Sequence, residues 1–507
     1  MGIKRYTAIE DTTITNAYKT NLRTRATASN MGLSDSLEVF HIYGQESSSS
    51  AENSRVLIRF KVTGSNSIES DRTSGDIPAS GNVSFYLRMF NVKHPFTLPR
   101  NYHMTVAAIS QSWQEGSGLD MESYSDQGAS NWTDSLSGSG GVTTWVSGGG
   151  GSFHSSPTYD VYFDNGTEDI ELDITTLVEQ WITGSDAGIG GSATGKENFG
   201  IGLYLANESA ASSSYTKKFS ARDSEFFFKR PVIEARWDSA RKDDRGNFYY
   251  SSSLASAEDN LHTIYLFNYV KGRLRDIPKI PQGENILVSL YSGSGDNSKP
   301  FGTAIPLPIS HPSVKSAGDL HATGGWVATG IYSCSFAATA SSVPLTKLFD
   351  VWHSSSTQQA PQYFTGTIMP QTLAASNVSP STKYAMNITN LRDVYYRDET
   401  AQLRLFTRQK DWNPTIYSKA TAEVVPTIID SASFKVIRVI DEYEAIPFGT
   451  GTDMHTQISF DVSGSYFNLD MTMLEAGYAY GIKFAFYDEG ASSWNEYPDI
   501  FKFRVEE

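Results

Sequence analysis

The sequence predicts an all-β chain built from tandem β-sandwiches, and three observations carry this prediction. Apolar and polar residues alternate over most of the 507 residues, which is the period of a β-strand. Only 39% of the residues are hydrophobic and 19% are charged, as expected for strands that bury one face. In one short stretch, 171–184, the apolar residues instead recur with the period of a helix. At roughly 100–200 residues per domain, the length favours two to four domains.

Strand patterns begin in the first third of the chain. The stretches "SRVLIRFKV" and "NVSFYLRMFNV" each place every second residue, all apolar, on one side. Loops rich in serine, glycine and asparagine separate such stretches and are expected at the surface. The residues expected to face the core are Val56, Ile58, Phe60, Val62, Val83, Phe85, Leu87 and Met89.

The helical stretch "ELDITTLVEQWITG" carries one apolar stripe. Asp173 can cap its start and Gly184 can end it. The residues of the stripe, at helical spacing, are Ile174, Leu177, Val178 and Trp181.

Residues 238–260 are polar and lack periodicity, which predicts a linker or an extended docking segment. Strand patterns resume after it and predict two further β-sandwiches, 261–376 and 377–507. The residues expected to face their cores include Ile286, Val288, Leu290, Tyr480, Ile482, Phe484, Phe486, Phe503 and Val505.

Charge and cysteine content exclude several classes of protein. The formal net charge is −15, whereas nucleic-acid binding needs an excess of lysine and arginine. The single cysteine, Cys334, excludes a disulfide framework within the chain and is expected to be a buried thiol. We find no apolar run long enough for a membrane span and no secretory signal, so synthesis in a cytoplasm is expected.

Several motifs follow one another in order over residues 1–237. They are Asn30-x-Gly32, Trp113-x-Glu115, a Thr-Trp pair ending at Trp145, "DITTLVEQW" at 173–181, and an Arg-Pro strand at 230–235. In order and spacing this set resembles the DNRLRE, or disaggregatase-related repeat, family of jelly-roll modules. The sequence departs from the family pattern at the acidic Ile9-Glu10-Asp11 and in the glycine- and serine-rich loop at 135–156.

That resemblance implies an N-terminal jelly roll, 1–237, with one short helix. The helix would cross one open end of the sandwich, and Trp181 would be the largest side chain closing the core. Burial of each large apolar side chain there would stabilise the fold by roughly 1.5–3 kcal/mol.

The last 125 or so residues resemble an immunoglobulin or fibronectin-III sandwich. "LEAGYAY" places Tyr480 six residues after Leu474, as in a tyrosine corner whose phenol bonds back to the backbone. The same spacing links Val378 and Tyr384, at a position we assign to the start of the third body.

Phrases such as "FDVSGSYFNLDMTMLEAGYAYGIKFAFYDEG" are similar to structural proteins of tailed bacteriophages. The resemblance implies a virion location after assembly in the host cytoplasm. It also implies capsid, neck or tail proteins as partners, in a symmetric assembly of many copies. It implies no position on the particle.

Catalytic and metal-binding patterns are few. The histidines form no zinc motif, and neither a nucleophile elbow nor a Walker loop is present. Glu115 and Asp120 could act as a glycosidase pair, although solvated loop acids are the simpler interpretation. Asp169, Glu171 and Asp173 alternate onto one strand face and could hold Ca²⁺, or be exposed acids and a helix cap. We therefore expect no enzyme activity, no cofactor and no metal.

Three tryptophans lie in or near long loops of the first body. Trp113, Trp132 and Trp145 could stack on sugars or contact a partner protein, and core packing explains them equally well. Two functions follow: a virion component that works by protein–protein docking, or a carbohydrate-binding adhesin on a virion or cell. A polysaccharide-cleaving enzyme is a third, without a visible site.

Overall fold

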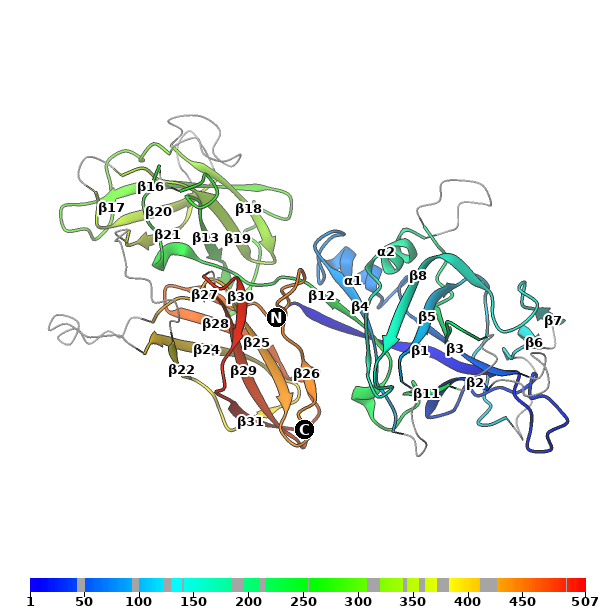
Figure 1. Ribbon diagram of the computed structural model, residues 1–507. Coiled ribbons are helices and arrows are strands. Elements are labelled where there is room, and N and C mark those ends of the chain that lie inside the picture. The colour runs from blue at the N-terminus through cyan, green and yellow to red at the C-terminus, as the bar shows by residue number, and fades with distance from the viewer. Residues whose placement is uncertain are drawn as a thin grey trace. The chain divides into compact units, whose positions relative to one another are not determined.

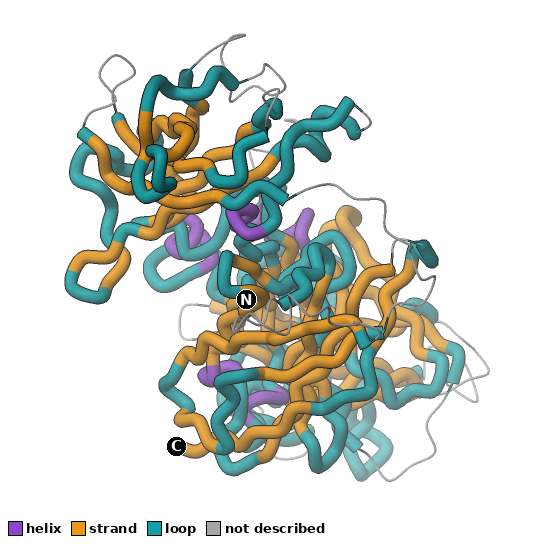
Figure 2. Tube along the Cα trace, turned by 90° about the vertical axis from the view of Figure 1, so that its left-hand side faces the viewer, coloured by secondary structure: helices purple, strands orange, loops and turns teal. Residues whose placement is uncertain are grey.

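The computed structural model describes residues 1–42, 51–93, 100–121, 129–138, 141–184, 195–208, 215–253, 255–307, 320–340, 344–354, 361–371, 383–410, 426–488 and 490–507. Strands make up most of the regular structure and only a few short helices accompany them (Figure 2). The all-β prediction is therefore confirmed. The chain divides into two compact units, residues 2–238 and 239–507, which are described separately. No helix in the described ranges is long and apolar enough to span a membrane.

The first unit is a jelly-roll-like arrangement in which ten of the strands form one connected sheet in two layers. Its path is β8-β5-β10-β3-β1-β12-β4-β9, with β2 joining β3 to β11 and a separate β6–β7 pair (Figure 1). Its elements are β1 Ile3–Thr15, β2 Ser36–Ile42, β3 Glu52–Phe60, α1 Ile68–Ser74, β4 Ser84–Met89, β5 Tyr102–Ile109, β6 Asp134–Gly138, β7 Gly141–Thr144, β8 Phe153–Phe163, β9 Ile170–Asp173, α2 Thr175–Thr183, β10 Ile201–Leu205, β11 Tyr215–Ser220, the 3₁₀ turn η2 Phe227–Lys229 and β12 Val232–Arg236.

Strand β1 passes from one layer to the other. Its first part, from Ile3 to Thr7, pairs with β12, and its remainder pairs with β3. The register shifts between Ala8 and Glu10, so Ile9 is an extra residue at a bulge. Bulges bend strands, and this one lies at the acidic Ile9-Glu10-Asp11 that departs from the family pattern.

The core of the first unit fills the space between the layers. All eight residues expected to face it are buried within one apolar cluster: six lie in β3 and β4, and Val62 and Val83 lie just beyond their ends. The opposite face of β3 is also covered: Leu57 packs with Ile14 and Ile109 in a second cluster. The sheet is therefore buried on both faces here, which simple alternation does not reveal.

Helix α2 closes the main core as predicted. Its four stripe residues are at most 1% exposed and belong to the main cluster. Gly184 ends the helix with φ 70°, and its N–H donates to the carbonyl of Gln180. Asp173 precedes the N-cap residue Ile174 and accepts the N–H of Thr175 at 2.9 Å.

A second helix, α1, corrects the expectation of a single one. It has only seven residues, too few for an apolar stripe to show in the sequence. Its signals are local: Ser67 and Ser70 form a reciprocal capping box, and Gly75 ends it in the left-handed conformation.

The second unit contains two β bodies. The first is a seven-stranded sheet of path β13-β19-β18-β16-β20-β21 with β17 beside β16. The other is a sandwich of β22-β24-β28-β27 against β23-β31-β29-β25-β26, with β30 beside β29 (Figure 1). The elements are η3 Asp244–Gly246, β13 His262–Phe267, β14 Tyr269–Val270, β15 Arg273–Leu274, β16 Asn285–Gly293, β17 Pro300–Phe301, β18 Ala322–Ala328, β19 Ile331–Phe336, β20 Leu348–His353, β21 Gln362–Ile368, β22 Tyr384–Ile388, β23 Val394–Tyr396, β24 Thr400–Gln409, β25 Ala432–Arg438, β26 Glu444–Ile446, β27 Ser459–Asp461, β28 Gly464–Asp470, η4 Met471–Met473, β29 Ala479–Asp488, β30 Ser493–Glu496 and β31 Phe501–Glu506.

The polar segment expected at 238–260 is fastened to both bodies. Arg245 is 8% exposed, and its Nη2 lies 2.8 Å from Oδ2 of the fully buried Asp350 on β20. Phe248 joins the apolar core of the seven-stranded sheet. Asp243 donates its N–H to the carbonyl of Phe460 on β27, at 3.0 Å. The segment therefore contributes to the core instead of only joining two bodies.

The tyrosine corner and the buried thiol are both present. The hydroxyl of Tyr480 donates to the carbonyl of Glu475 at 2.9 Å and accepts its N–H at 2.8 Å. Cys334 is buried, and burial raises the pKa of its thiol. The equivalent corner expected at Val378 lies outside the described residues.

Candidate functional site

A partly buried acid–arginine cluster joins three distant parts of the first unit. Glu115 Oε1 accepts the N–H of Asp11 at 2.7 Å, and its carboxylate receives Arg222 Nε at 3.0 Å and Nη2 at 3.1 Å. The N–H of Arg222 donates to Asp11 Oδ2 at 2.6 Å. Each residue thus contacts the other two, and the cluster lies next to the β1 bulge.

Asn30 fixes the loop that carries Glu115. Its Nδ2 donates to the carbonyls of Glu115 at 2.6 Å and Ser130 at 2.9 Å, and its Oδ1 accepts the N–H of Gly32 and of Gly118, each at 3.0 Å. All four hydrogen-bonding positions of the amide are used. A Cβ at Gly118 would lie 1.8 Å from the carbonyl oxygen of Asn30, so only glycine fits there. The Asn-x-Gly and Trp-x-Glu motifs therefore meet in space.

Burial shifts the protonation of this cluster. It raises the pKa of Asp11 from 3.8 to about 7, although the N–H of Arg222 opposes the shift. It also raises the pKa of Glu115, against the stabilising effect of Asp11 N–H and Arg222. Asp11 is 1% exposed, and no polar atom of the described residues bonds its Oδ1. A carboxyl so enclosed is out of reach of a polymeric substrate.

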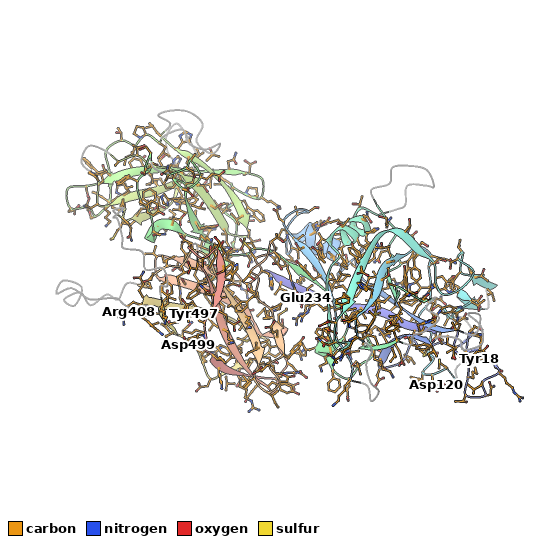
Figure 3. The ribbon with its side chains drawn as sticks, viewed as in Figure 1. Tyr18, Asp120, Glu234, Arg408, Tyr497 and Asp499 are labelled. Carbon is orange, nitrogen blue, oxygen red and sulfur yellow. The ribbon has the colours of Figure 1, made fainter. Side chains whose placement is uncertain are left out.

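The candidate glycosidase pair is not joined into one group. Glu115 is engaged by Arg222 and Asp11, whereas Asp120 is exposed. In the view of Figure 3 the labels of Asp120 and Tyr18 fall toward one end of this unit and that of Glu234 toward the other.

A second buried acid, Glu234 on β12, is surrounded by arginines. Its Oε1 lies 2.7 Å from Arg5 Nε and 3.0 Å from Arg88 Nη1, and its Oε2 lies 2.6 Å from Arg236 Nη2. The carboxylate is fully buried. Burial alone would raise its pKa, but the three guanidinium groups outweigh that effect and lower it. Arg236 continues the network to Glu171 at 2.6 Å.

The three acids proposed for calcium have other roles. Glu171 pairs with Arg236, Asp173 accepts the N–H of Thr175, and Asp169 accepts the N–H of Asn91 at 2.7 Å. Across the described ranges, no three histidine, cysteine or acidic side chains are grouped so that they could hold a metal ion.

A lysine ammonium occupies the neighbouring loop instead. Lys217 is fully buried, and its Nζ donates to the carbonyls of Gly166 and Glu168 and to Asn91 Oδ1 at 2.7–3.0 Å. Phe163 and Phe219 face it at 4.9 and 5.2 Å. Burial lowers the pKa of Lys217 to about 8. The lysine acts as a built-in cation that fastens the loop before β9.

Two of the three candidate contact tryptophans are core residues. Trp113 and Trp145 are each 2% exposed and belong to the second cluster, over Leu57. Their Nε1 atoms donate to the carbonyls of Phe199 at 2.7 Å and Asn131 at 2.8 Å. The expectation of a contact surface is wrong for these two, because a buried ring offers no face to a sugar. They cover the outer face of a sheet that is buried on both sides.

Trp132 is partly buried against the same cluster. The guanidinium of Arg55 lies 5.3 Å from its ring and is held by Glu208, with Nη2 to Oε2 at 2.5 Å. One face of the indole is therefore already covered by a cation within the unit.

An exposed aromatic turn was not anticipated from the sequence. In η2 and the residue before it, Phe226 is 54% exposed and Phe227 is 48% exposed. Lys229 Nζ lies 5.7 Å from the first ring, and Arg230 Cζ lies 5.3 Å from the second. The signal was the run "FFFKRP", since three consecutive aromatic residues cannot all face one side of a strand.

The described folds define the class of protein: an all-β chain of several sheets, with a jelly-roll-like first unit. No protein-family model matches the chain, and no curated protein matches it. Among solved structures, a trypsin-activated α-2-macroglobulin from Escherichia coli is similar at 8% identity, with a TM-score of 0.15. That alignment covers 89% of this chain and 24% of the macroglobulin. A likeness this weak carries no argument about function.

Proposed function

We propose that this chain is a non-enzymatic structural component of a tailed-phage virion, and that it works by docking onto other virion proteins. The pair of exposed rings at Phe226 and Phe227 is the observation that carries this proposal. Adjacent exposed apolar side chains, unlike single scattered ones, mark interaction sites, and aromatic and arginine side chains contribute most at protein interfaces. A particle supplies such partners in many copies.

Hydrogen bonds hold the turn that carries these rings. The N–H of Lys229 donates to the carbonyl of Phe226 at 2.9 Å, and Arg230 Nε donates to the carbonyl of Ser224 at 3.0 Å. The two cations lie beside the rings. Because hydrogen bonds already fix the backbone of the turn, less conformational entropy is lost when a partner binds it.

The resemblance of the sequence to phage structural proteins supplies the virion part of this proposal. Three acids support the non-enzymatic part: the partly buried Glu115 and the buried Glu234 are occupied by arginine, and Asp11 is enclosed. Burial of Trp113 and Trp145 weakens the adhesin alternative, because it removes two of the three rings proposed as a sugar platform.

The test is incorporation into particles. Purified virions should contain the full chain at constant copy number, and immunogold labelling should place it on the particle. The double variant Phe226→Ser/Phe227→Ser should reduce copy number by about tenfold or more, because docking loses two exposed aromatic anchors.

A matched control removes two other exposed apolar side chains of the same unit. The variant Leu22→Ser/Val146→Ser changes residues that are 77% and 87% exposed, and its copy number should stay normal. Particles that lack the chain would overturn the proposal, and so would normal incorporation of the phenylalanine variant.

A further inference from the structure

A short hairpin projects exposed residues from the second unit. Strands β14 and β15 form a two-stranded sheet of their own, in which Tyr269 pairs with Leu274 and Val270 with Arg273. Lys271 and Gly272 form the two-residue turn with φ angles of 52° and 76°, as in the turns that favour hairpins. Tyr269 is 60% exposed and Val270 is 50% exposed.

The hairpin carries cations that have no partner of opposite charge. Lys271, Arg273 and Arg275 are exposed, and no carboxylate of the described chain pairs with any of them. Elsewhere arginines are typically matched within the chain, as Arg236 is by Glu234 and Arg404 by Asp461. The hairpin therefore presents positive charge to the outside of a protein whose net charge is −15.

The base of the hairpin is braced. Asn268 donates its N–H to the carbonyl of Gly330 at 2.7 Å and its Nδ2 to the carbonyl of Arg275 at 2.6 Å. Asp276 Oδ1 accepts the N–H of Gly330 at 2.6 Å and Nε1 of Trp326 at 3.0 Å. The turn between β18 and β19 thus holds the hairpin in one orientation.

A hollow of complementary chemistry lies in the last sandwich, beside the end of β31. Its volume is about 840 Å³. Asp398 and Glu507 are exposed there and have no cationic partner among the described residues, and Tyr396 is 51% exposed. The residues lining it are Tyr396, Arg397, Asp398, Glu399, Thr472 and Glu507.

We propose that the β14–β15 hairpin of one copy docks into this hollow of a second copy of the chain. Lys271 and Arg273 would face Asp398 and Glu507, and Tyr269 would pack beside Tyr396. The contact joins two different surfaces, so it is heterologous and builds a ring or a filament.

Charge favours a second copy over a polyanion such as nucleic acid. A net charge of −15 repels a polyanion at long range, whereas the hollow offers three carboxylates against one guanidinium, that of Arg397, next to an exposed ring. This inference does not depend on the Phe226–Phe227 surface or on a virion. It is tested on the purified chain alone, so its failure is distinguishable from that of the proposed function.

The experiment is sedimentation velocity of the full chain over a range of concentrations at low salt. Self-association should strengthen with concentration and weaken at about 1 M salt, where the Debye length falls to about 3 Å. Reversing the hairpin charges with Lys271→Glu/Arg273→Glu should weaken association by about tenfold or more. Reversing the charge of the hollow with Asp398→Lys/Glu507→Lys should weaken self-association to a similar extent.

The decisive variant combines the two hairpin changes with the two hollow changes. The hairpin and the hollow then carry complementary charges again, so self-association should return. The matched control, Arg23→Glu/Lys61→Glu, makes the same charge change at exposed sites of the other unit and should associate like the parent. A chain that stays monomeric at low salt overturns the proposal. Association that the hairpin variant leaves unchanged, or hairpin-dependent binding to heparin or duplex DNA without self-association, also overturns it.

Discussion

Two buried carboxyl groups of the first unit, Glu234 and Asp11, respond to burial in opposite ways. Both are at most 1% exposed. Glu234 receives three guanidinium groups, and they lower its pKa. Asp11 receives one backbone N–H and lies beside the acidic Glu115, and burial raises its pKa to about 7. Desolvation is the first contribution in both cases, so the neighbouring charges decide the sign.

The difference shows two uses of a buried acid. Glu234 lies where Arg5, Arg88 and Arg236 converge from three strands, so one buried carboxylate neutralises three cations, two of which also contact Glu171. Asp11 sits at a bulge where the strand changes layer, and there it mainly orders backbone. The first arrangement requires the charge, whereas the second only requires the acceptor oxygen.

The largest effect is expected for Glu234→Gln. The amide has the same shape but removes the fully buried anion that three guanidinium groups share, and only the half-exposed Glu171 remains for Arg88 and Arg236, which should destabilise the first unit by about 3–5 kcal/mol. Urea unfolding measures the change. Glu225→Gln, the same substitution at an exposed position, should change stability by less than about 0.5 kcal/mol. Equal effects of the two variants would show that the arginines do not need the charge.

Asp11→Asn should produce a smaller effect that depends on pH. The folded pKa is raised, so the native state holds an extra proton between about pH 4 and 7, and parent stability falls as pH rises through that window. Asn carries no charge to desolvate and keeps the acceptor for Arg222. As the pH is raised from 4 to 8, the unfolding free energy of the variant should therefore increase relative to that of the parent by roughly 2–4 kcal/mol.

Unfolding at a series of pH values tests this sign. Asp120→Asn, the same change at an exposed residue, should leave the pH dependence as in the parent. If the stability of Asp11→Asn relative to the parent rose as the pH fell, the sign assigned to the Asp11 contribution would be wrong. The Glu234 contribution has the other sign: it is present above about pH 4.5 and is lost as the pH falls below that value.

The smallest effect is expected at a partly exposed ion pair of the same unit. Lys218 Nζ lies 3.3 Å from Glu38 Oε2, with side chains that are 32% and 35% exposed. Solvent screens such pairs, so Lys218→Gln should change the unfolding free energy by about 0–0.5 kcal/mol. A loss of stability as large as that of Glu234→Gln would mean that burial does not explain the difference between the exposed Lys218–Glu38 pair and the buried Glu234 pairs.

The fold class and much of the core were predictable because they follow from local periodicity. The alternating residues of β3 and β4 and the stripe of α2 are buried as expected. The tyrosine corner was predictable because it needs only seven consecutive residues, Leu474 to Tyr480. Helix α1 was missed because seven residues give no periodic signal.

The acid–arginine cluster was not predictable as a cluster. Asp11 and Glu115 are 104 positions apart, and Glu115 and Arg222 are 107 apart, so only the fold brings them together. The prediction that Trp113 and Trp145 form a contact surface was wrong for a related reason. Trp113 and Trp145 follow loop-like sequence, but they cover a sheet face that alternation assigns to solvent.

The polar segment 238–260, through Arg245 and Phe248, determines where a recombinant fragment of the second unit should begin. Cloning from residue 261, where strand periodicity resumes, would delete both side chains. Asp350 would then keep its charge without its guanidinium, and an aromatic-sized void would open in the adjoining core. Expression trials that start at residue 239 should yield well-folded material where those that start at 261 give aggregates.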